Sequence, residues 1–166
     1  KNVGHIPLYY AHKNTGRPLK EGKWFEKFRS NYLDVDNDAL YPFGYGLSYT
    51  TFRFSDVTLS QPSIGMDNQL VASVTVTNTG DRAGSEVVQL YIRDLVGSVT
   101  RPVKELKGFE KIYLQPNESR TVRFTIAPEM LKFYNADLQF VAEPGDFDVM
   151  IGPDSQNVKT ARFTLR

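Results

Sequence analysis

Three aspartates at alternate positions, Asp34, Asp36 and Asp38, first suggest chemistry, because closely spaced carboxylates can bind calcium. An EF-hand loop that began with them would need glycine at its sixth position and glutamate at its twelfth. The chain has Ala39 and Tyr45 there instead. The pattern therefore favours an acidic surface loop, and we predict no metal site.

The two histidines, His5 and His12, have no carboxylate at a motif-like spacing between them. A zinc-protease helix needs two histidines four residues apart with an intervening glutamate, and a three-histidine site needs a third histidine. The pattern favours structural or hydrogen-bonding roles. Because His12 follows a short apolar run where a loop begins, a minor substrate-side role in a longer enzyme stays open.

Paired carboxyl groups that face one another across a sugar would indicate glycoside hydrolysis. Asp146 and Asp148 are expected on one strand face, and Glu105 and Glu110 lie near a break in the strand pattern. None of the four belongs to a recognisable motif. The sequence therefore favours solvated surface carboxylates and predicts no catalytic residue in this chain.

Other catalytic and binding motifs are also missing from the sequence. Gly44 and Gly46 do not precede a helix with phosphate-binding spacing. Asn117 begins a glycosylation-type triplet, but the sequence favours a simple hairpin turn there. No Gly-x-Ser-x-Gly elbow surrounds the candidate nucleophiles, Ser48, Ser119 and Ser155.

Tyr91, Tyr113 and Tyr134 are candidates for a sugar-stacking platform, since flat aromatic faces suit the apolar faces of sugars. The competing interpretation is packing across strands or against a neighbouring domain. The sequence favours packing.

The composition excludes several classes of function. The 166-residue chain has 20 basic and 19 acidic residues and a net charge of +1, so charge gives no case for nucleic acid or an anionic membrane. Cysteine is absent, which removes disulfides, thiol catalysis and thiolate metal sites.

From Phe52 onward, apolar residues recur at every second position. This alternation gives each strand one buried face and one solvent face, which is typical of antiparallel sheets. About seven such runs separated by turn residues predict an all-β sandwich of immunoglobulin or fibronectin type III character. The clearest runs are residues 57–59, 70–76, 88–92, 122–126, 147–151 and 161–165.

Two irregularities are expected within this sandwich. Apolar residues three apart between Leu106 and Leu114 indicate a bulge near Gly108 or a strand that changes sheets. Residues 128–132 read as a single helical turn.

Residues 1–50 cannot assemble a core alone, so we expect an irregular aromatic arm that needs a partner surface. Residues 6–10 could form a short edge strand. Trp24, Phe25 and Phe28 fit either one helical turn or an aromatic loop. Residues 40–52 are uncharged and rich in aromatic residues, which predicts a tether packed against bodies on both sides.

Three stretches resemble glycoside hydrolase family 3. Residues 41–50 (YPFGYGLSYT) closely resemble the junction between the second catalytic domain and a C-terminal fibronectin type III-like domain. Residues 4–18 (GHIPLYYAHKNTGRP) resemble the end of that catalytic domain in the β-glucosidase branch. Residues 101–109 (RPVKELKGF) resemble part of the terminal domain. The resemblance therefore covers the tail of such an enzyme.

The resemblance implies that residues 1–50 are the tail of an α/β catalytic domain plus the junction, and that residues 51–166 are a fibronectin type III-like domain. The parent would be a periplasmic or secreted enzyme that removes terminal non-reducing β-D-glucosyl residues, with retention and without a cofactor. The partners of the chain would be the catalytic domains of the same polypeptide.

The family's nucleophile is an aspartate of an upstream domain, and its acid/base commonly comes from the second domain. Neither motif occurs here, so we transfer no catalytic, cofactor-binding or metal-binding residue. Three alternatives stay open: a β-xylosidase parent, a free-standing carbohydrate-binding module, and a protein-interaction module.

Overall fold

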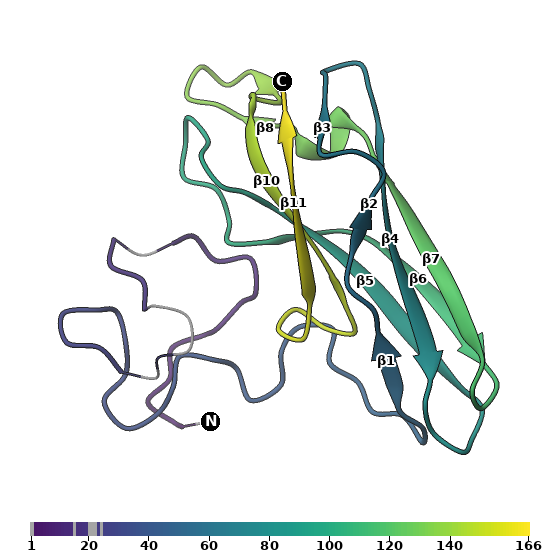
Figure 1. Ribbon diagram of the computed structural model, residues 1–166. Helices are drawn as coiled ribbons and strands as arrows, with labels where there is room; N and C mark the ends of the chain where they lie inside the picture. The colour runs from purple at the N-terminus through teal and green to yellow at the C-terminus, as the bar shows by residue number, and fades with distance from the viewer. Residues whose placement is uncertain (1, 15, 20–22, 24) are drawn as a thin grey trace.

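The computed structural model describes residues 2–14, 16–19, 23 and 25–166. Figure 1 shows two β-sheets packed face to face, with the N-terminal segment looped against one side of them. Strand β4 (Leu70–Asn78) illustrates why the sheets form, because its residues alternate strictly between buried and partly exposed. Its buried apolar side chains belong to the core between the sheets, as predicted.

The first sheet is built around β4, which pairs antiparallel with β7 (Ser119–Ile126), β1 (Phe52–Phe54) and β2 (Thr58–Leu59). The second sheet has the order β3 (Ser63–Ile64), β11 (Lys159–Leu165), β10 (Gly145–Gly152), β5 (Gly84–Asp94) and β6 (Glu105–Leu114). Its pairs are antiparallel except for β3 and β11, which run parallel. The chain thus forms the predicted sandwich.

Both predicted irregularities are present. The register between β5 and β6 shifts after Leu90, which pairs with Gly108, so that Tyr91 pairs with Leu106 and Lys107 is the extra residue. This is the bulge expected near Gly108, and β6 stays within one sheet. Residues Pro128–Leu131 form a 3-10 turn, followed by the small hairpin of β8 (Phe133–Tyr134) and β9 (Phe140–Val141).

The arm, which we define as the described residues before β1, contains no strand or helix in the part that the structure describes. The expected strand at residues 6–10 is therefore wrong. The amide of Ile6 instead donates a hydrogen bond to the Tyr32 hydroxyl oxygen, at 3.1 Å. The aromatic segment is a loop over residues 25–30, where Phe28 has a φ of 64°. Trp24 lies outside the described residues. Within the described chain, no helix is long and apolar enough to cross a membrane.

Candidate functional site: the arm on the outer face of the sheet

The outer face of the five-stranded sheet is not a solvent face where the arm crosses it. Successive side chains of a strand point to opposite faces, and Val88, Leu90 and Ile92 point into the core. Gln89 and Tyr91, which alternate with them, therefore point away from it. Yet Gln89 is 4% exposed and Tyr91 is fully buried. Strand alternation alone would leave both side chains in solvent, but the arm covers them.

Gln89 fixes the arm to the sheet. Its Nε2 donates hydrogen bonds to the carbonyl of Gly44, at 3.2 Å, and to that of Pro153. Its Oε1 accepts one from the Tyr91 hydroxyl at 2.5 Å. Gly44 has a φ of +81°, and a Cβ there would lie 2.0 Å from Gln89 Oε1. Only glycine allows this close approach of the arm backbone.

Aromatic rings complete the contact. Tyr10 stacks on Phe43, with ring centroids 4.2 Å apart, and meets Tyr91 edge-on at 5.8 Å. Burial raises the pKa of the Tyr91 hydroxyl, and nearby Tyr10 and Asp154 raise it further. Tyr91 therefore keeps its proton and remains a donor to Gln89.

Backbone hydrogen bonds hold the arm at several further points. The amide of Ser155 donates to the carbonyl of Phe43 and that of Val103 donates to His12, both at 2.9 Å. Near β1, the amide of Thr79 donates to the carbonyl of Thr51 at 2.8 Å. The tether predicted at residues 40–52 is thus confirmed on its sandwich side.

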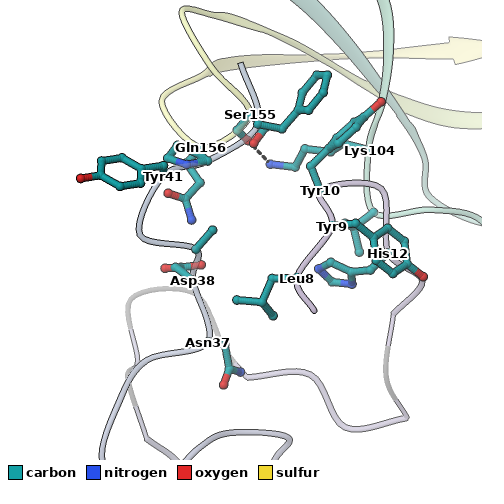
Figure 2. Close-up of a pocket in the computed structure, with 14 residues that line it drawn as sticks. Leu8, Tyr9, Tyr10, His12, Asn37, Asp38, Tyr41, Lys104, Ser155 and Gln156 are labelled. Carbon is teal, nitrogen blue, oxygen red and sulfur yellow. Dashed lines mark hydrogen bonds between the residues drawn. The ribbon is translucent and has the colours of Figure 1, made fainter. Parts of the chain in front are cut away.

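A cleft of about 510 Å³ lies between the arm and the sandwich. Figure 2 shows its walls, formed by residues 8–12 and 37–43 of the arm and by the loops after β5 and β10. Lys104 Nζ donates to the carbonyl of Ser155 at 2.5 Å. Burial lowers the pKa of Lys104, and nearby Arg93 adds to this, whereas Asp38 and Asp154 oppose it.

Comparison with known proteins identifies this architecture. Residues 86–155 match the fibronectin type III-like domain. The sandwich is a fibronectin type III-like domain.

The similarity to whole proteins extends beyond this domain. The chain is 55% identical over 165 residues to the periplasmic β-glucosidase of Salmonella typhimurium, covering 99% of the chain and 21% of that protein. It is 44% identical over 166 residues to a putative β-xylosidase of Formosa agariphila, covering 100% and 20%. The β-glucosidase from Listeria innocua, crystallised with glucose, superposes with a TM-score of 0.89 at 42% identity, over 96% of this chain and 22% of that one. The chain thus spans about a fifth of the length of these relatives and corresponds to the C-terminal region of family 3 β-glucosidases.

The candidate metal ligands do not converge. Asp36 Oδ1 accepts a hydrogen bond from the backbone amide of Asp38, at 3.1 Å, as in an ordinary acidic turn. The His5 ring lies 4.4 Å from that of Tyr32, while His12 borders the cleft. Among the described residues, no group of three His, Asp or Glu side chains could hold a metal ion.

Three of the four carboxylates considered from the sequence have structural partners, and Glu110 is exposed on β6. Asp146 accepts from Thr164 at 2.7 Å, and Asp148 accepts from Arg162 at 2.8 Å. Glu105 accepts from Arg101 at 2.8 Å. These contacts satisfy the acceptors without forming a cleft between two carboxylates. That no residue of this chain is catalytic stays a prediction.

The segment at residues 101–109, which carries part of the family resemblance, has a clear structural task. The Arg101 guanidinium lies 3.6 Å from the Asp94 carboxylate and 4.2 Å from the centre of the Phe133 ring. Burial raises the pKa of Asp94, and the charge of Arg101 opposes that rise. Arg101 therefore ties the loop after β5 to the hairpin.

The tyrosine platform considered from the sequence does not form. Tyr91 is buried under the arm, and Tyr113 faces outward from β6. Tyr134 packs on Phe140 in the hairpin, with ring centroids 5.0 Å apart. Packing, the interpretation that the sequence favoured, is confirmed for Tyr91 and Tyr134.

Proposed function

We propose that the chain is the accessory C-terminal region of a family 3 β-glucosidase and that it braces the catalytic domains of the same polypeptide. The observation that carries this proposal is the extent of the match, which covers nearly the whole chain but about a fifth of each relative. The hydrogen bonds between the arm and the sandwich support it, because they hold Phe43 and Gly44 against the fibronectin type III-like domain.

The surface of the junction supports the same role. Gly44 lies beside Gln89 on the outer face of β5, and Thr50 lies beside Gly84 at the start of β5 and donates a hydrogen bond to Asn78 Oδ1 at 2.7 Å. Between Gly44 and Thr50 the apolar side chains point outward, and Leu47 is 90% exposed. The neighbouring outward positions of β6 hold further exposed aromatic residues. The exposed apolar side chains of the junction and of β6 are Tyr45, Leu47, Tyr49, Phe109 and Tyr113.

An apolar face of this kind marks an interaction site, because soluble monomers rarely leave such surface in water. The polypeptide that precedes the matched region in the longer relatives is the partner that fits. The tether at residues 40–52 was predicted to pack against a body on each side. We assign its second partner to the catalytic domains of the longer polypeptide.

The parent would release terminal β-D-glucosyl residues from oligosaccharides in the periplasm or outside the cell. Similarity to the periplasmic β-glucosidase of Salmonella typhimurium supports this substrate and location. A β-xyloside is the second candidate substrate, supported by similarity to the putative β-xylosidase of Formosa agariphila.

The experiment compares the chain alone, the longer polypeptide, and that polypeptide ending before residue 1. We expect the chain alone to leave an aryl β-glucoside intact, the longer polypeptide to cleave it, and the shortened one to lose activity and melt earlier. Turnover by the chain alone that a single carboxylate substitution abolishes would refute the accessory role. Unchanged activity and melting of the shortened enzyme would refute the bracing.

A further inference from the structure

The cleft between the arm and the sandwich has the size of a small-molecule site. Its volume of about 510 Å³ falls within the range of roughly 300–1,000 Å³ typical of such sites. Four separate chain segments meet in its walls, and hydrogen bonds from Lys104 and Ser155 join three of them. The cleft is therefore part of the folded contact between the arm and the fibronectin type III-like domain.

Exposed polar side chains from three of these segments, Asp38, Gln156 and His12, border the cleft. Within the described chain, no side chain or carbonyl hydrogen-bonds to the Asp38 carboxylate, the Gln156 side-chain amide or His12 Nε2. Figure 2 shows Asp38 and His12 on opposite sides of Leu8, with the Gln156 amide extending towards Asp38. A carboxylate accepts hydrogen bonds, whereas an amide both donates and accepts them.

The remaining lining is aromatic and close to neutral in charge. The stacked rings of Tyr10 and Phe43 border the cleft, together with Tyr9. The lining carries one positive side chain, Lys104, and one negative side chain, Asp38, and one N–H of Lys104 is already used by Ser155. The cleft thus offers ring faces and hydroxyl partners but no excess charge for an ion.

From this lining we propose that the cleft binds a short neutral saccharide. The apolar C–H faces of the sugar pack against the rings, and its hydroxyl groups donate to Asp38 and exchange hydrogen bonds with Gln156 and His12. The site gives the accessory region its own contact with oligosaccharide. It rests on the proposed function only for the choice of a β-glucoside as the probe.

The experiment is a titration of the ¹⁵N-labelled 166-residue chain with cellobiose, followed through the backbone and side-chain amide signals. We expect saturable shifts around Asp38, Lys104 and Gln156, with a midpoint in the millimolar range. Asp38→Ala should weaken binding about tenfold, because it removes the charged acceptor, and Gln156→Ala about fivefold. Asp137→Ala is the matched control, since its carboxylate is exposed in the loop between β8 and β9.

Three results would overturn the proposal. One is the absence of saturable shifts at the cleft up to about 50 mM cellobiose. Another is equal binding by the wild-type chain and both cleft variants. The third is the same shifts with sodium sulfate, which would make the cleft an anion site. These outcomes are separable from a failure of the bracing role, because they use the isolated chain and no glycosidase assay.

Discussion

Gly44 is the residue on which the position of the arm depends most directly. Its φ of +81° is unfavourable for other residues, and an added Cβ would lie 2.0 Å from Gln89 Oε1. We expect Gly44→Ala to lower the free energy of unfolding by roughly 1–3 kcal/mol, because it adds backbone strain and displaces the buried amide of Gln89. Urea unfolding followed by tyrosine fluorescence measures this change.

Gly46→Ala provides the matched control two residues along the same junction. A Cβ at Gly46 would meet no atom within 4 Å. The control should therefore change stability by no more than about 0.5 kcal/mol. Equal losses in the two variants would show that the junction does not hold the arm through Gly44.

Tyr91 should make the chain less stable in alkali. Burial raises its pKa, so above a pH of about 10 the unfolded chain releases a phenolic proton that the folded chain retains. The stabilisation is therefore complete below that pH and declines above it. In Tyr91→Phe this contribution is absent, and Gln89 Oε1 loses its donor, at a cost of about 1–2 kcal/mol at neutral pH.

The measurement is urea unfolding of wild type and Tyr91→Phe at neutral pH and above pH 10. The difference in unfolding free energy should narrow at the higher pH, because the wild type alone loses the contribution of Tyr91. A difference independent of pH would mean that the Tyr91 hydroxyl is not protected by the arm.

The sequence could indicate Gly44 but not Gln89. A glycine in an aromatic, uncharged stretch signals a close backbone approach, and the structure contains that approach. Gln89 is polar at an outward position, so local alternation assigns it to solvent. Its burial follows from a chain segment 45 residues away in sequence, which strand periodicity does not encode.

At the scale of elements, the same limit separates the sandwich from the arm. Strands such as β4 were predictable because one buried face imposes period two on the sequence. The bulge at Lys107 was predictable because it changes the phase of that period. The arm has no hydrophobic period of its own, since its contacts depend on partners in distant parts of the chain, both on the sheet and within the arm.

The short apolar run at residues 6–10 shows why local sequence patterns fail to predict the structure of the arm. Its composition suited an edge strand, but the Tyr32 hydroxyl satisfies the Ile6 amide and the Tyr10 ring turns towards Phe43 and Tyr91. Long-range aromatic packing therefore overrides local strand propensity. The proposed boundary at residue 50 marks the point where the sequence changes to an alternating strand pattern. In the structure, hydrogen bonds cross this boundary and join the arm to the sandwich.

At the scale of the whole molecule, the two ends of the domain present similar exposed leucines with different expected roles. Leu47 in the junction is 90% exposed and Leu138 in the hairpin is 81% exposed. If catalytic domains cover the junction, Leu47 becomes buried in the longer polypeptide, whereas nothing in the proposal covers Leu138. Comparing substitutions at these two positions therefore tests whether the catalytic domains contact the junction or the hairpin.

We expect Leu47→Ser and Leu138→Ser each to leave the melting temperature of the isolated 166-residue chain nearly unchanged, because both side chains are in solvent. In the longer polypeptide, Leu47→Ser should cost about 1.5–3 kcal/mol, the value of burying a leucine, and Leu138→Ser should cost little. Differential scanning calorimetry of the four variant proteins beside the two parents measures this. Equal effects of Leu47→Ser in the chain and in the longer polypeptide would place the catalytic domains elsewhere, and a large effect of Leu138→Ser in the longer polypeptide would move the contact to the hairpin end.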